Sequence, residues 1–252
     1  MSLSIVVLAK NEEKNIKKCL EACFFADEIL VIDDFSQDGT SKIVKSLEKN
    51  KIKLVQRELN NDFATQRNFA FEKVTSEWVL FIDADESISQ ELAAEIIQIT
   101  NSQTSQNGFF IKRVDILWGK KITHGELLNF KTLRLGKKDA GAWKGKVHEE
   151  WKIKGKVGIL ENILIHEPHT SIKEFIREIN FYTTIRAEEL FKKGATTNAL
   201  LIILYPEAKF ILNYFIKMGF LDGVEGLLLS LLMSLHSFLV RGKLYLLQKN
   251  KK

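Results

Sequence analysis

Trp78-Val79-Leu80-Phe81-Ile82-Asp83-Ala84-Asp85-Glu86 is the stretch of this 252-residue chain that decides its fold. Five apolar residues in a row are typical of a strand buried on both faces of a parallel sheet. The carboxylates that follow end the strand, and Ser89 is a suitable cap for a helix over residues 90–100. This order of buried strand, acidic turn and helix predicts one unit of an α/β fold.

The same order repeats toward the N-terminus. Apolar strands are predicted over residues 3–9, 28–32 and 52–56, and helices over residues 13–23, 41–48 and 63–73, the last capped by Asp62. The alternation predicts a parallel sheet. Ligands of such sheets bind beyond the carboxyl ends of the strands. We therefore expect Ala9-Lys10-Asn11-Glu12, Asp33-Asp34 and the turn after Ile82 to meet at one edge.

The pattern changes after residue 107. Further strands are predicted over residues 108–117, 130–135, 147–153 and 163–166. We interpret them as a mixed or antiparallel extension that closes the site. Beyond Pro168 the chain becomes helical, first with an amphipathic stretch over residues 171–193. The sequence thus predicts an α/β domain over residues 1–168 and a helical region over residues 169–252.

The helical region is unusually apolar and ends in lysines. Residues 227–235 form an almost uninterrupted apolar run, but Asp222 and Glu225 precede the run and His236 and Arg241 follow it. A bilayer span needs about 20 apolar residues, so these charges disfavour one. Two interpretations stay open: a helical surface that lies on a membrane with its basic residues at anionic headgroups, and an interface between copies of the chain.

The net charge of +5 suits nucleic acid, anionic lipid or a phosphorylated small molecule. Zinc-finger spacing and interleaved aromatic and basic residues do not occur, so we expect no nucleic-acid partner.

Cys19 and Cys23 lie four apart on a predicted helix, a poor geometry for a disulfide, and fit two buried thiols in a reducing compartment. Because the N-terminus lacks the pattern of a secretion signal, a cytoplasmic protein is expected.

The acidic strand ends suggest chemistry. Asp83 and Asp85 repel one another, and a Mg²⁺ or Mn²⁺ ion bridging them to phosphate oxygens would offset that repulsion. Asp33 and Asp34 can accept hydrogen bonds from a ribose hydroxyl or a base N–H. Capping of the following helices is the alternative role for all four acids.

Other polar residues fit the same edge. Asn11 and Glu12 open the first predicted helix, whose dipole favours anions. Arg67 can neutralise a diphosphate with its forked donors. A first-turn helix role for Glu12 and a surface salt bridge for Arg67 are the alternatives. Serine-hydrolase elbows, phosphate-binding loops and the dinucleotide fingerprint do not occur in the sequence.

With these residues in view, the chain resembles the inverting glycosyltransferases of family 2, which have a GT-A fold. The motifs that carry the resemblance are residues 6–13, 26–33, 36–40, 66–68 and 78–86. A closer resemblance, to the subgroup that includes lipopolysaccharide core β-1,4-glucosyltransferases, continues through residues 146–149 and 219–223. The resemblance implies a Rossmann-like mixed sheet flanked by helices, with a helical C-terminal appendage.

The resemblance also implies a reaction. A nucleoside diphosphate sugar, with a UDP-hexose favoured, donates a hexose to a lipid-linked or lipopolysaccharide-core glycan, in one displacement that inverts the anomeric carbon. Such an enzyme is expected at the inner face of the cytoplasmic membrane. The donor-binding residues that it implies are Ala9, Asn11, Glu12, Asp33, Asp34, Arg67, Asp83, Ala84 and Asp85.

The displacement needs a carboxylate base near the acceptor. The sequence offers His148-Glu149-Glu150, and we predict Glu149 as the base, with His148 joining Asp83 and Asp85 as a metal ligand. A neutral strand residue is the alternative for His148. His166 and His169 can reach the diphosphate or serve in the core or a loop. A nucleotidyltransferase that makes a nucleotide sugar and a non-catalytic nucleotide-sugar-binding protein are the alternative functions.

Overall fold

The computed structural model describes residues 2–47, 51–145, 149–168 and 171–250. The chain forms two compact units, Met1–Arg113 with Phe130–His166, and Val114–Asn129 with Glu167–Lys252. The second unit thus takes in residues 114–129, which the sequence analysis had assigned to the α/β domain. They group with the helices because their short strand and turn pack on the last helix.

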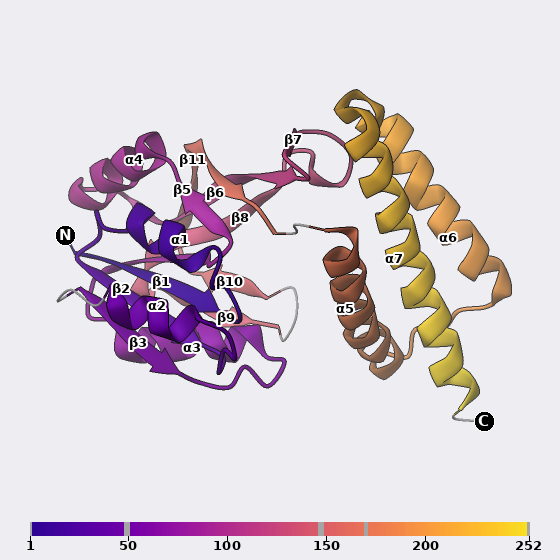
Figure 1. The fold of residues 1–252 in the computed structure, drawn as a ribbon, viewed down its shortest axis with the longest axis horizontal. Helices are drawn as coiled ribbons and strands as arrows, with labels where there is room; N and C mark the ends of the chain where they lie inside the picture. Colours follow the sequence, from indigo (N-terminus) through magenta and orange to yellow (C-terminus); the bar gives the residue numbers. More distant parts are fainter. Residues whose placement is uncertain (1, 48–50, 146–148, 169–170, 251–252) are drawn as a thin grey trace. The chain divides into compact units, whose positions relative to one another are not determined.

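The first unit begins with the predicted alternation (Figure 1). Its elements are β1 (Leu3–Ala9), α1 (Ile16–Ala22), β2 (Glu28–Asp33), α2 (Thr40–Ser46), β3 (Ile52–Gln56), α3 (Phe63–Lys73), β4 (Trp78–Asp83) and α4 (Gln90–Asn101). The strands pair in parallel in the order β3-β2-β1-β4. Asp62 and Ser89 cap α3 and α4 by accepting hydrogen bonds from Thr65 N and Leu92 N. The parallel-sheet prediction is confirmed.

An antiparallel extension continues the sheet, so the predicted mixed sheet is also confirmed. It is built from β5 (Glu86–Ile88), β6 (Gln106–Leu117), β8 (Lys131–Lys137) and β11 (Lys156–His166), with the order β4-β8-β6-β11-β5. β8 pairs antiparallel with β4 and β6, and β11 pairs antiparallel with β5. After the short helix η2 (Lys138–Ala140), β9 (Gly141–Lys144) and β10 (Glu150–Ile153) form a separate hairpin.

Alternating side chains of the central strands fill two cores. Ile5 and Val7 of β1 face the core beneath α1, α2 and α4, where Cys19 and Cys23 are buried as free thiols, as predicted. Val6 faces the other core, beneath α3 and the hairpin, where Trp143 and Trp151 pack on Phe81. The hairpin is therefore fixed to the sheet by aromatic packing.

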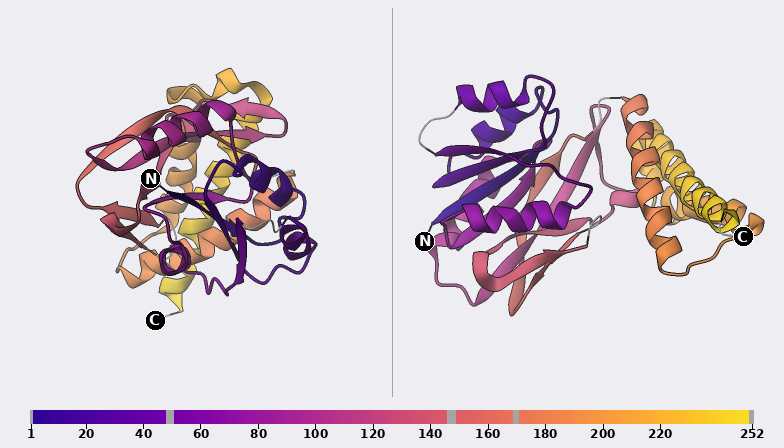
Figure 2. Two further views of the ribbon diagram at one scale, coloured as in Figure 1. Left: turned by 90° about the vertical axis from the view of Figure 1, so that its left-hand side faces the viewer. Right: turned by 90° about the horizontal axis from the view of Figure 1, so that it is seen from below.

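The second unit contains β7 (Lys120–Ile122), η1 (Gly125–Leu127), α5 (Ile172–Lys192), α6 (Ala199–Ile211), the π-helical turn η3 (Leu212–Ile216), η4 (Gly219–Asp222) and α7 (Gly223–Lys249). A capping box at Ser171 and Glu174 starts α5 where the sequence predicted. Helices α5 and α6 pack beside α7 (Figure 2). Two helical segments, Ala199–Ile216 and Gly219–Lys249, are long and apolar enough to cross a membrane. Length and composition alone are weak evidence for a membrane span.

Candidate active site

The carboxyl ends of β1, β2 and β4 lie side by side, as the parallel sheet requires. Ala9 pairs with Asp33 on β2, and Leu8 pairs with Asp83 on β4. Backbone hydrogen bonds extend these ladders past the strand ends, from Asp34 N to Ala9 O at 2.9 Å and from Ala84 N to Leu8 O at 3.2 Å. The acidic strand ends that the sequence placed at one edge are therefore neighbours.

Asn11 and Glu12 hold the β1–α1 loop against the β2–α2 loop. Asn11 N donates to Ser36 Oγ at 2.8 Å, Gln37 N donates to Asn11 Oδ1 at 2.8 Å, and Glu12 N donates to Thr40 Oγ1 at 2.7 Å. The predicted helix start at Glu13 is wrong, because α1 begins at Ile16. The backbone N–H groups of both residues bind the neighbouring loop, so they do not form the helix N-terminus that was expected to attract an anion.

Asp33 is fully buried and hydrogen-bonded within the chain. It accepts hydrogen bonds from Ser36, from Ser41 Oγ at 2.8 Å and from Gln56 Nε2 at 3.0 Å. Burial opposes its ionisation, but the hydrogen bonds from Ser36, Gln56 and Ser41 outweigh it and lower the pKa of Asp33. Its carboxylate thus organises the turn after β2. The alternative of a helix cap is wrong for Asp33, because α2 begins after Gly39 without a side-chain cap.

Asp34 lies at the same turn beside an exposed aromatic ring. Its Oδ1 accepts a hydrogen bond from Leu59 N at 3.0 Å, and its Oδ2 pairs with Lys10 Nζ at 2.5 Å. Phe35 follows with a left-handed backbone, φ 48°, and 51% of its surface exposed. A bulky residue in that conformation is uncommon and costs free energy, so its presentation at a ligand edge points to a function. No motif in the sequence marked Phe35 as a site residue.

Asp83 lies between two arginines. Arg67 Nη2 donates to its Oδ1 and Arg134 Nη2 donates to its Oδ2, both at 2.9 Å. Burial opposes the charge of Asp83, but the positive charges of Arg134 and Arg67 outweigh it and hold its pKa far below the usual range. Both oxygens of this predicted metal ligand are therefore already engaged by cations.

Glu86 stabilises the acidic turn through hydrogen bonds to Asp83 and Arg134. Its Oε2 accepts a hydrogen bond from Asp83 N at 2.9 Å, and its Oε1 accepts one from Arg134 Nη2 at 3.0 Å. Burial raises the pKa of Glu86, although Arg134 and Arg113 act against the rise. Arg134 was not predicted as a residue of this cluster, because its partners are far away in the sequence and no motif surrounds it.

Gln66-Arg67-Asn68 connects the acidic edge to the hairpin. Arg67 is only 3% exposed, and its Nε donates to Glu149 Oε1 at 3.0 Å while its Nη2 holds Asp83. Asn68 exchanges two hydrogen bonds with the backbone of Trp143, at 2.9 and 3.0 Å. Arg67 thereby links the predicted base to the acidic turn. The other predicted residue of that loop, His148, lies outside the described residues.

Asp85 has a different neighbour. Its Oδ2 lies 3.3 Å from His166 Nε2, because β11 pairs with β5 and brings His166 opposite Glu86. Its Oδ1 is buried and has no hydrogen-bond partner among the residues that the structure describes. No group of three His, Cys, Asp or Glu side chains within the described ranges could hold a metal by itself. The orphaned oxygen and the imidazole do fit a divalent cation whose other ligands come from a bound diphosphate.

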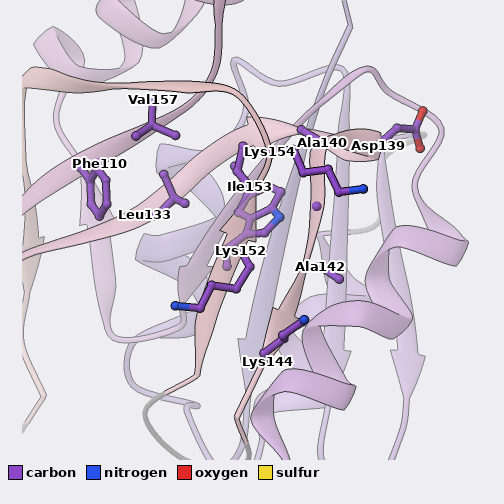
Figure 3. A pocket seen from close by; sticks show the side chains of 12 residues that line it. Phe110, Leu133, Asp139, Ala140, Ala142, Lys144, Lys152, Ile153, Lys154 and Val157 are labelled. Atoms are coloured by element: carbon purple, nitrogen blue, oxygen red, sulfur yellow. The ribbon is translucent and has the colours of Figure 1, made fainter.

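A groove of about 640 Å³ opens elsewhere on the first unit, along the hairpin (Figure 3). Phe110, Leu133 and Ile153 supply its apolar lining, and Lys144 and Lys154 are among its polar residues. The acids described above do not line it. The groove is therefore distinct from the acidic edge.

A parallel sheet that carries acidic turns at its carboxyl edge and continues into an antiparallel extension is the architecture of the GT-A fold, which glycosyltransferases use. The model of the family "Glycosyl transferase family 2" matches residues 4–148, and the chain belongs to that family. This confirms the resemblance found in the sequence, and it makes the protein an enzyme that transfers a sugar.

Several relatives match along almost the whole chain. An uncharacterised glycosyltransferase of Rickettsia typhi is 28% identical over 96% of this chain and 86% of its own length. The lipopolysaccharide core biosynthesis glycosyltransferase LpsC of Rhizobium meliloti is 26% identical over 97% and 92%. Among solved structures, the Pyrobaculum calidifontis mannosyltransferase bound to GDP-mannose and Mn²⁺ shares the fold, with a TM-score of 0.52, 14% identity, and coverage of 96% of this chain and 86% of that one.

Proposed function

We propose that this enzyme moves a hexose from a nucleoside diphosphate sugar, with a UDP-sugar favoured, to a lipid-linked or lipopolysaccharide-core glycan at the cytoplasmic face of the membrane. The observation that carries the proposal is the Arg67 link, which holds Asp83 at the donor edge and Glu149 on the hairpin within hydrogen-bond distance of one guanidinium. The name of the relative LpsC supports the acceptor class. Membership of the family favours sugar transfer over the two alternatives, a nucleotidyltransferase and a non-catalytic binding protein.

The nucleoside is assigned to the turn after β2. Both acids there are hydrogen-bonded within the chain, but Asp33 is fully buried and engaged by three side chains, whereas one partner of Asp34 is the exposed Lys10. We therefore assign contact with the base or ribose to Asp34. The exposed ring of Phe35 offers a flat surface on which a base can stack. Ala9 at the end of β1 and Ala84 after β4 are small and buried at the same edge of the sheet, where they let the ligand approach the strand ends.

The cation is assigned to Asp85 and His166 rather than to the predicted set with Asp83 and His148. Asp85 contributes its unpaired oxygen and His166 its Nε2. A Mg²⁺ or Mn²⁺ ion bound there would neutralise the diphosphate and make it a better leaving group. Asp83 then acts indirectly, because its pairs with Arg67 and Arg134 fix the turn that presents Asp85.

Glu149 is assigned as the general base. The acceptor hydroxyl gives its proton to the Glu149 carboxylate as its oxygen attacks the anomeric carbon. The bond between that carbon and the diphosphate oxygen breaks in the same step, and the nucleoside diphosphate leaves with the electron pair. Arg67 orients the carboxylate through Nε and keeps it beside the donor.

A donor panel tests the proposal. Purified full-length enzyme is incubated with UDP-, GDP- and ADP-sugars, each with Mg²⁺, Mn²⁺ or EDTA, and nucleoside diphosphate release is measured with and without a glycolipid extract. We expect release with a UDP-sugar that depends on the divalent ion and rises with acceptor. Release that is unaffected by EDTA would contradict the metal assignment, and no release with any donor would contradict the proposed function.

A further inference from the structure

The segment that joins α6 to α7, residues 211–224, has its polarity reversed. Its large apolar side chains each expose more than a third of their surface: Ile211, Leu212, Phe215, Ile216, Met218, Phe220, Leu221 and Val224. The residues that it buries are Asn213, Gly219 and Asp222, which are polar or small. A surface in contact with water normally shows the opposite distribution. We call this segment the hairpin tip, after the helical hairpin of α6 and α7, which is a different feature from the β9–β10 hairpin.

A polar network explains how the hairpin tip holds this arrangement. The buried Asp222 carboxylate accepts hydrogen bonds from Thr123 N at 3.1 Å and His124 N at 2.8 Å. Asn213 Nδ2 donates to Glu126 Oε2 at 2.9 Å, and Lys209 pairs with the same carboxylate at 2.7 Å. Residues 123–126 thus bind the buried polar side chains of the tip, and the apolar side chains of the tip stay exposed.

Helix α6 extends the apolar surface of the hairpin tip. The structure describes α6 over its whole length, and α6 buries none of its side chains. Leu200, Ile203, Leu204 and Ile211 are exposed and recur at intervals of three, four and seven residues, so they share one face of the helix. Glu207 is the charged residue on that face. The tip and this face together form a contiguous apolar patch of the kind that marks an interaction site.

We propose that this patch is inserted into the boundary between headgroups and acyl chains of an anionic bilayer, with α6 lying in the membrane plane. Reversed polarity favours lipid as the partner, because hydrocarbon solvates apolar side chains and rejects the polar groups that the tip has buried. Residues 199–252 also contain seven Lys or Arg and three Asp or Glu, which favours anionic headgroups.

The polar network also argues for a surface position over a span. If α6 and α7 crossed the bilayer as a pair, the hairpin tip would carry its bound segment with it, and Lys120, Lys121 and Glu126 would have to enter the hydrocarbon. Charged side chains at that depth are costly. An interfacial position leaves these residues among the headgroups. The inference extends the proposed action on a lipid-linked acceptor, since it names the surface that brings the enzyme to that acceptor.

Vesicle sedimentation of the full-length protein tests the inference. We expect it to pellet with vesicles of phosphatidylcholine and phosphatidylglycerol, and much less with phosphatidylcholine alone. The double variant Ile216→Asp/Val224→Asp should lose at least tenfold in bound fraction. Ile97→Asp is the matched control, because Ile97 is an exposed apolar residue on α4 of the first unit. Nucleoside diphosphate release with a water-soluble acceptor should be unchanged in both variants.

A fluorescence measurement separates insertion from electrostatic adhesion. An environment-sensitive dye on an Ile216→Cys variant should shift to the blue with anionic vesicles, and labelling is selective because Cys19 and Cys23 are buried. Vesicle binding by the double variant equal to wild type would overturn the inference. So would a wild-type dimer that the double variant converts to monomer while vesicle binding persists, since the patch would then join two copies. Lost sugar transfer with intact vesicle binding would contradict only the proposed function.

Discussion

Replacing Arg67 by lysine tests the central link of the site. The guanidinium donates from Nη2 to Asp83 and from Nε to Glu149, at 2.9 and 3.0 Å. A lysine retains the positive charge, but its single ammonium on a flexible stem cannot present two donors in that fixed fork. One charge-assisted hydrogen bond is therefore lost, and such a bond contributes about 1.5–3 kcal/mol.

If the transition state uses both links, the loss appears in full in kcat/KM, as a decrease of roughly 10- to 150-fold for Arg67→Lys. Lysine is a better test than methionine. Arg67→Met would leave Asp83 and Glu149 without their shared cation and would cost about 3–5 kcal/mol of folding stability, as expected when a buried pair loses one partner. Unfolding would then confuse the kinetic result.

The assay is steady-state nucleoside diphosphate release, with the urea midpoint of each variant measured in parallel. Arg186→Lys serves as the control, because Arg186 pairs with Glu189 on the exposed face of α5. Such surface pairs contribute about 0–1 kcal/mol, so its kinetics should match wild type. A value of kcat/KM for Arg67→Lys equal to wild type, in a folded protein, would refute the idea that Arg67 couples the base to the donor edge.

Three further predictions concern other parts of the site. Asp85→Asn should lower kcat/KM by at least about 100-fold and weaken Mn²⁺ binding measured by electron paramagnetic resonance, because the orphaned oxygen loses its charge. Phe35→Ala should raise the donor KM roughly tenfold with kcat little changed, since base stacking contributes about 1–3 kcal/mol. Asp33→Asn should make stability less dependent on pH in acid. The folded pKa of Asp33 is lowered, so its stabilisation is present above the unfolded value near about 4 and is lost as the pH falls through the folded value.

The two kinetic predictions have matched control variants. Asp139→Asn removes a carboxylate from the groove beside the hairpin and should leave Mn²⁺ binding intact. Phe24→Ala removes an exposed ring away from the strand ends and should leave the donor KM unchanged. For Asp33→Asn, urea midpoints are compared across the acid range. A midpoint that falls with pH as steeply as in wild type would show that Asp33 titrates normally.

The parallel half of the fold could be predicted because its signals are local. Each strand is a short apolar run, and Asp62 and Ser89 mark helix starts with side chains that bond three residues ahead. Strands β5, β7 and β9 were missed because three or four residues carry no periodic pattern. They exist through pairing with another strand: β7 and β9 pair with strands close in sequence, and β5 pairs with the distant β11, where Ile88 lies opposite Leu164.

The sequence predicted where the candidate site lies, but it did not predict which of its carboxylates are paired with arginine or histidine. The rule for parallel sheets places Asp33, Asp34 and Asp83 at one edge from sequence alone. The sequence does not show which carboxylates are already paired. Arg134 reaches Asp83 from a strand 51 residues further along the chain, so its role follows only from the folded sheet. His166 likewise lies beside Asp85 because β11 pairs with β5.

The hairpin β9–β10 gives the enzyme a modular construction. Its strands pair with each other rather than with the main sheet, and Glu149 directly precedes β10. Trp143 and Trp151 stack at a centroid distance of 5.5 Å, and Asn68 binds the Trp143 backbone, so the two strands are attached by contacts other than the Arg67–Glu149 pair. Evolution can therefore alter the exposed side chains of β9 and β10 to suit a new acceptor while Arg67 keeps Glu149 beside the donor edge.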